Sequence, residues 1–158
     1  ATNDFLYPEK EACYSQMNTL VSFVSEHDAA VALALTKNIA DPKLRRIATM
    51  NVAAMPRQWR DLGEASSISV CRSLGDYGPV CIRGVVAGMM EFGTPGKEAD
   101  RAMEYCSDMS LTENEKRECV AEIVVMGSGM FSRERLKSLC AKIPDDLWPP
   151  TCSSLSTL

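Results

Sequence analysis

The stretch CRSLGDYGPVC, residues 71–81, contains the pattern that decides the fold. Its two cysteines bracket a run of turn-forming residues, Gly-Asp-Tyr-Gly-Pro, which favours a reversal of the chain. Beyond Cys81, apolar residues at offsets of one, four, five, eight and eleven trace one stripe of a helix. We therefore expect a helix that ends at Cys71, a short loop, and a second helix that begins at Cys81.

The same arrangement occurs three times along the chain. The first cysteines of the pairs recur at intervals of 35 and 34 residues, and the second cysteines at intervals of 38 and 33. A period in the thirties is typical of stacked helical hairpins. The three pairs are Cys71/Cys81, Cys106/Cys119 and Cys140/Cys152.

Each pair is expected to form a disulfide. Both thiols lie at the same end of an antiparallel helix pair, where the geometry of a bridge is easily met. Closing such a loop stabilises the folded chain by about 3 kcal/mol in the chain-entropy account. Cytosolic proteins rarely keep such bonds, so the pattern predicts an oxidising compartment and a secreted or periplasmic protein.

The apolar pattern predicts which other residues face the core. Three residues after each first cysteine stands an apolar residue that continues the inward face of its helix. These residues are Leu74, Met109 and Ile143. The stripe that starts at each second cysteine reaches its last apolar position eleven residues later, at Phe92 and at Met130.

Cys13 has the pattern of a second cysteine, because apolar residues follow it at the same offsets of one, four, eight and eleven. These residues are Tyr14, Met17, Val21 and Val24. The partner of Cys13 is expected 10 to 13 residues upstream, where no cysteine stands. Three explanations remain open: the partner was removed with preceding sequence, Cys13 is a free thiol, or Cys13 bridges to another chain.

The remaining segments also read as helices. We expect one over 28–38 and another over 42–54, with Asp41 as N-cap and Pro42 at the first helical position. Another helical stretch follows Pro56 and reaches the first paired cysteine. The run 122–126 is apolar enough for a strand, but it lies in a longer helical stripe.

The predicted fold is all-α, with eight to nine helices arranged as antiparallel helix-pair repeats in an α-solenoid or a compact helical bundle. We expect a single domain over residues 1–158. Both ends interrupt a repeat, which leaves open that the domain belongs to a longer repeat chain.

The cysteine layout resembles that of disulfide-stapled bacterial helical-hairpin repeat proteins, among them secreted cysteine-rich proteins with tetratricopeptide-like repeats. The resemblance covers residues 68–152. The segment from Glu91-Phe-Gly-Thr-Pro-Gly96 to Tyr105-Cys106 is similar to their loop and helix, and residues 139–152 look like a second bacterial Cys-helix repeat. The loops between cysteines are longer here, and residues 126–129 lack the Pro-Gly loop. The resemblance implies a secreted or periplasmic interaction scaffold and transfers no catalytic residue.

Composition excludes several function classes. Seventeen basic against 21 acidic residues argue against nucleic-acid binding, which needs clustered cations. No apolar run reaches the roughly 18 residues of a membrane span. The single histidine, His27, cannot meet Cys13 on one straight helix, and the sequence contains no CxxC motif and no phosphate-binding glycine loop. We predict no enzyme, no cofactor and no metal ligand.

Two tryptophans are candidates for a binding surface. Trp59 stands between Arg57 and Arg60, a combination typical of interface hot spots, and Trp148 lies between the last two cysteines. The predicted function is a non-catalytic exported scaffold that binds a protein or peptide. The alternative is a periplasmic metal-binding protein that uses thiols and its nine methionines.

Overall fold

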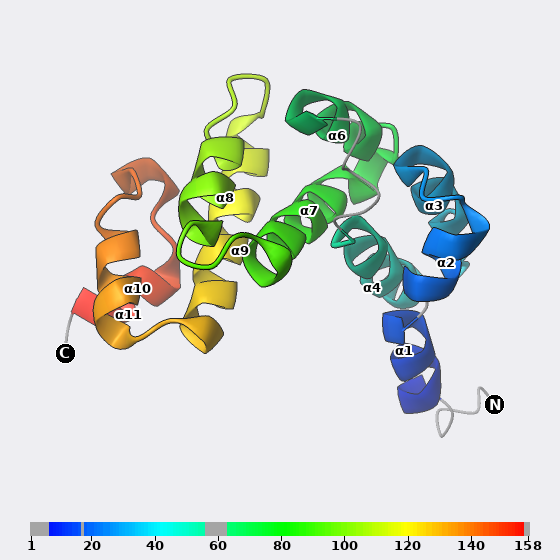
Figure 1. The fold of residues 1–158 in the computed structure, drawn as a ribbon, viewed down its shortest axis with the longest axis horizontal. Helices are drawn as coiled ribbons and strands as arrows, with labels where there is room; N and C mark the ends of the chain where they lie inside the picture. The colour runs from blue at the N-terminus through cyan, green and yellow to red at the C-terminus, as the bar shows by residue number, and fades with distance from the viewer. Residues whose placement is uncertain (1–6, 17, 56–62, 157–158) are drawn as a thin grey trace. The chain divides into compact units, whose positions relative to one another are not determined.

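The computed structural model describes residues 7–16, 18–55 and 63–156, and all regular secondary structure in these ranges is helical (Figure 1). This confirms the predicted all-α class, including a helix rather than a strand over 122–126. The α-helices are α1 (Tyr7–Gln16), α2 (Asn18–Val24), α3 (Ala29–Thr36), α4 (Pro42–Ala53), α6 (Gly63–Arg72), α7 (Gly78–Phe92), α8 (Glu98–Cys106), α9 (Glu113–Met130), α10 (Arg133–Cys140) and α11 (Pro150–Ser156). Two short 3-10 helices, η2 (Gly75–Tyr77) and η3 (Asp145–Leu147), lie in loops between paired cysteines.

The chain divides into two compact units, Ala1–Val85 and Val86–Leu158, and the division falls within α7. Each unit has its own set of packed helices. The expectation of a single domain stays a prediction.

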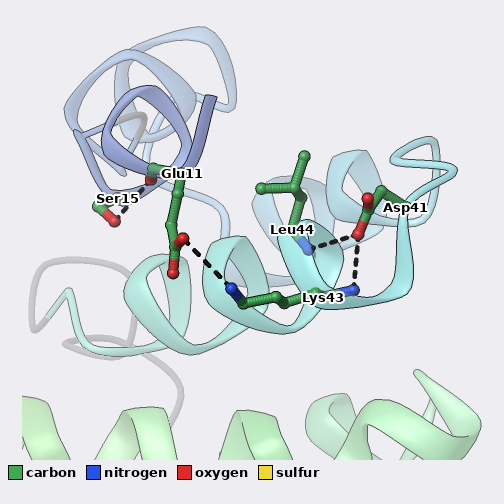
Figure 2. Close-up of polar contacts among 5 residues, drawn as sticks. All are labelled: Glu11, Ser15, Asp41, Lys43 and Leu44. Carbon is green, nitrogen blue, oxygen red and sulfur yellow. Dashed lines mark hydrogen bonds and ion pairs between the residues drawn. The ribbon is translucent and has the colours of Figure 1, made fainter. Parts of the chain in front are cut away.

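Side-chain caps set the start of several helices. Asp41 precedes α4, and its Oδ1 accepts hydrogen bonds from the backbone N–H groups of Lys43 at 2.8 Å and Leu44 at 3.0 Å (Figure 2). These groups have no partner within the helix, so the cap stabilises its first turn. At α9, the Thr112 hydroxyl and the Glu115 carboxylate form a reciprocal capping box. The predicted roles of Asp41 and Pro42 are confirmed.

In the first unit, α4 packs against α1, α2 and α3. Its buried face includes Leu44, Ala48 and Val52, which a helix presents at spacings of three and four residues. An ion pair of 3.3 Å between Lys43 and Glu11 joins α4 to α1 at the surface (Figure 2).

α7 and α4 approach each other closely where α7 carries Gly84. A Cβ added at Gly84 would collide with the carbonyl oxygen of Met50 and lie 2.7 Å from the Cβ of Ala53. Only a residue without a side chain allows the two backbones to come this near.

In the second unit, α9 packs against α8, α10 and α11 (Figure 1). Its buried side chains include Val120, Ile123 and Val124, which continue the stripe predicted from Cys119. Tyr105 of α8 and Leu136 of α10 are also buried. The apolar stripe of α9 therefore forms part of this unit's core.

The predicted stripes after Cys81 and Cys119 are buried or half-buried except at their last position. The residues eleven positions after Cys13, Cys81 and Cys119 are exposed by 62%, 54% and 47%, in that order. The expectation of an inward position was wrong for all three, because each is the final residue of its helix and the packing partner does not extend over it. These residues are Val24, Phe92 and Met130.

Candidate functional site

All three predicted disulfides are present, and each joins the end of one helix to the first turns of the next. The bonded pairs have Cα–Cα distances of 5.3, 5.6 and 5.6 Å and are buried. Each first cysteine lies in the last turn of α6, α8 or α10, as expected. The bonds are Cys71–Cys81, Cys106–Cys119 and Cys140–Cys152.

The loop of the middle pair departs from the other two. Leu74 and Ile143 are buried as predicted, whereas Met109 is 96% exposed. This loop is the longest of the three, with a separation of 13 residues against 10 and 12. α8 ends at Cys106, so Met109 lies in the turn after the helix, and Leu111 is the buried apolar residue of that turn. The prediction of an inward Met109 was wrong.

Cys13 is an exposed free cysteine in the single chain. It is the seventh residue of α1, as Cys119 is the seventh residue of α9. The other two second cysteines lie nearer the start of their helices, since Cys81 is the fourth residue of α7 and Cys152 the third of α11. The stripe predicted from Cys13 is divided between α1 and α2. Of that stripe, Val21 is buried.

Of the predicted binding residues, Arg57, Trp59 and Arg60 lie outside the described residues. Trp148 follows η3 and is half-buried, and its backbone N–H donates to the carbonyl of Asp145 at 3.3 Å. It is therefore part of the loop closed by Cys140–Cys152.

The structure exposes an apolar surface that the sequence interpretation missed. On α2, the side chains of Leu20, Phe23 and Val24 are 65%, 77% and 62% exposed. Their spacing of three and four residues places them on one face of the helix, while Val21 points into the core. We call these three residues the α2 patch. The signal was available as a second apolar face of residues 20–24, but hydrophobic periodicity alone does not tell which of two apolar faces is buried.

An ordered junction follows the α2 patch. Glu26 and His27 both have positive φ, 52° and 67°, a left-handed conformation that is uncommon for residues other than glycine. Backbone hydrogen bonds from Ser25 to Val21 and from Asp28 to Ser25, both 2.9 Å, close the turn. Asp28 then caps α3 by accepting from the N–H of Val31 at 3.0 Å.

Two acidic residues follow the patch in the sequence. Glu26 and Asp28 are exposed and stand within five residues of Phe23. A positively charged group on a binding partner would be attracted to this end of α2.

In the second unit, two ion pairs join the start of α8 to α10 and the turn after it. The carboxylate of Glu98, which is buried, accepts from Arg135 at 2.7 Å, and Asp100 pairs with Lys142 at 2.9 Å. The backbone N–H of Glu98 itself and the Arg135 guanidinium hold the pKa of the Glu98 carboxyl below its ordinary value, against the opposite effect of burial. Lys142 likewise lowers the pKa of Asp100. These contacts account for both acids as structural groups.

Within the described ranges, no cluster of three or more His, Cys, Asp or Glu side chains could hold a metal ion. No helix of the described chain is long and apolar enough to cross a membrane. Comparison with protein-family models, with curated proteins and with solved structures gives no match.

Proposed function

We propose that this chain is an exported bacterial helical-repeat protein that binds a protein or peptide without catalysing a reaction. The α2 patch carries the proposal. Three large apolar side chains, each more than three-fifths exposed, stand together on one helix face. Clustered apolar side chains at a surface are typical of binding sites, whereas single ones are common everywhere.

The chemistry around the patch indicates the class of partner. Phe23 offers an aromatic ring with few rotatable bonds, flanked by the aliphatic Leu20 and Val24. Glu26 and Asp28 add negative charge at one edge. We therefore propose a partner segment with apolar side chains and a basic group beside them. The segment that contains Arg57, Trp59 and Arg60 stays a second proposed contact.

The three disulfides support the proposed compartment. Bonds of this kind form and persist in oxidising environments, such as the bacterial periplasm or the extracellular space. The resemblance to cysteine-rich tetratricopeptide-like repeat proteins supports the same placement. We propose a secreted or periplasmic protein.

Cys13 is proposed to link two copies of the chain. Its thiol is exposed, and six of the seven cysteines are already bonded within the chain. Under oxidising conditions an exposed thiol of this kind forms intermolecular disulfides. Electrophoresis without reductant is expected to show a dimer that the variant Cys13→Ser does not form. A wild-type protein that stays monomeric under air oxidation would contradict the link.

The alternative, a metal-binding protein that uses thiols and thioethers, has fewer ligands than its prediction required. Six cysteines are held in disulfides and offer no thiolate to a metal. No contact among the described residues favours this alternative over the binding scaffold.

Selection from a displayed peptide library tests the proposed function. The bait is the Cys13→Ser protein, which keeps disulfide exchange out of the measurement. Peptides selected on it are expected to bind the additional variant Phe23→Asp at least about tenfold more weakly, because a hot-spot side chain is lost. Val125→Asp is the matched control, since Val125 is also exposed, by 53%, but lies on α9.

The outcomes separate clearly. Loss of binding with Phe23→Asp and not with Val125→Asp supports the α2 patch. Equal binding to all three proteins would place the site elsewhere and overturn the proposal. Circular dichroism checks that both substitutions leave the helices intact, as expected for exposed side chains.

A further inference from the structure

Met109 is the most exposed large apolar residue among those the structure describes, at 96%. It lies in the loop between α8 and α9, inside the ring closed by Cys106–Cys119. Its thioether therefore faces solvent on nearly all sides, without packing contacts to shield the sulfur.

The loop holds Met109 in this position through contacts on both sides. Before it, the Ser107 hydroxyl donates to the carbonyl of Met103 at 2.7 Å. After it, the N–H of Ser110 donates to the Asp108 carboxylate at 2.7 Å, and the N–H of Leu111 donates to the Asp108 carbonyl at 3.1 Å. Leu111 is buried and the disulfide closes the ring, so Met109 lies on the solvent-facing side of the loop.

The other described methionines are more protected. Met90 is 1% exposed and Met130 is 47% exposed. The rest are half-buried: Met50, Met55, Met89, Met103 and Met126. The rate of thioether oxidation depends on how easily the oxidant reaches the sulfur. We therefore expect the more exposed methionines to be oxidised faster.

We propose that, among the methionines that the structure describes, Met109 is the preferred site of two-electron oxidation, with hydrogen peroxide as the oxidant class. The sulfur lone pair attacks one peroxide oxygen, an S–O bond forms, and the O–O bond breaks. The departing hydroxide takes the proton from the S–OH group that has formed, which leaves the sulfoxide and one water. The thioether is oxidised by two electrons to a sulfoxide, and the peroxide is reduced by the same two electrons.

Oxidation at this position changes the surface and leaves the core alone. The sulfoxide is polar, so the outer turn of the loop loses its apolar character. Oxidation removes no buried contact, because the Met109 side chain is almost fully exposed. The product is a folded protein with a modified loop, and methionine sulfoxide reductases provide the chemistry to reverse it.

Site-resolved kinetics test the proposal on the native, disulfide-bonded protein. Dilute hydrogen peroxide is added, samples are quenched with excess free methionine, and the sulfoxide at each methionine is followed by peptide mass spectrometry. Met109 is expected to react at least about tenfold faster than Met90 and several-fold faster than Met130. In reduced, denatured protein the rates are expected to converge.

A conservative variant completes the test. Met109→Leu is expected to remove the fastest-reacting site and to leave the rates at the other described methionines unchanged. The wild-type protein oxidised at Met109 is expected to keep its helix content and thermal midpoint. A Met109 rate no higher than that of Met130, or an unfolding transition lowered by its oxidation, would overturn the proposal.

Discussion

The hydroxyl of Thr49 on α4 donates a hydrogen bond of 3.1 Å to the hydroxyl of Thr36 on α3, and Thr36 donates in turn to the carbonyl of Leu33 at 2.7 Å. Both threonines are buried, at 0% and 1% exposure. The two side chains thus form a polar chain within the apolar contact between α3 and α4.

The direction of this chain predicts unequal effects of its two members. Thr36→Val leaves the Thr49 hydroxyl buried without an acceptor and is expected to lower the free energy of unfolding by about 1–3 kcal/mol. Thr49→Val leaves the hydrogen bond from Thr36 to Leu33 in place and is expected to lower the free energy of unfolding by less than Thr36→Val does. The double variant is expected to cost less than the sum, because no hydroxyl is then unpartnered. Urea unfolding measures all three, and strictly additive effects would contradict the chain.

The close approach at Gly84 predicts a severe effect of a single methyl group. Gly84→Ala is expected to destabilise the protein by about 2–3 kcal/mol, because the added Cβ meets the backbone of Met50 and the Cβ of Ala53. Thermal unfolding followed by circular dichroism measures the loss.

Gly129 supplies the matched control, since it also lies in a helix but a Cβ there meets nothing within 4 Å. Gly129→Ala is expected to leave stability unchanged or to raise it by about 0.5 kcal/mol. Equal effects of the two substitutions would show that the approach of α7 to α4 is looser than described.

The ion pair of Glu98 and Arg135 predicts a pH dependence. The folded-state pKa of Glu98 lies below the ordinary value of a glutamate carboxyl, so its contribution to stability is fully present above that ordinary value and is lost as pH falls through the folded-state pKa. In the variant Glu98→Gln, the free energy of unfolding is expected to fall less steeply as the pH is lowered into the acidic range. Glu104→Gln, an exposed position on the same helix, is the control. Part of the acid slope should remain, because the pKa values of Asp100 and Glu134 are also lowered.

The disulfide arrangement predicts a defined count of thiols. In the Cys13→Ser variant, alkylation of the unreduced protein is expected to add no group, and alkylation after reduction is expected to add six. Intact mass spectrometry measures both numbers. Replacing Cys71 and Cys81 together by Ala is expected to cost about 3 kcal/mol, by the entropy of a ring of this size. Any alkylation before reduction would contradict the pairing.

Much of the fold was predictable because its determinants are local. The cysteine spacing predicted all three bonds, and the order of Asp41 and Pro42 predicted the start of α4. Each of these features depends on residues close together in sequence. Composition and spacing therefore sufficed for the helix class and for the disulfides.

Exposure at the helix ends was not predictable in the same way. Val24, Phe92 and Met130 continue apolar stripes, and only the three-dimensional packing shows that each stripe runs past its partner. The α2 patch was missed for a different reason, because hydrophobic periodicity does not tell which of two apolar helix faces is buried. The positive φ of Glu26 and His27 also has no sequence signal, because neither is a glycine.

The order of the disulfides has a consequence for how the chain could acquire them. Each bond joins cysteines that are consecutive in the sequence, so no bond encloses another. When a chain is delivered N-terminus first into an oxidising compartment, each pair can close before the next cysteine arrives. Cys13 enters before all three pairs, so a bond between Cys13 and Cys71 is the mispairing that order of arrival alone does not prevent.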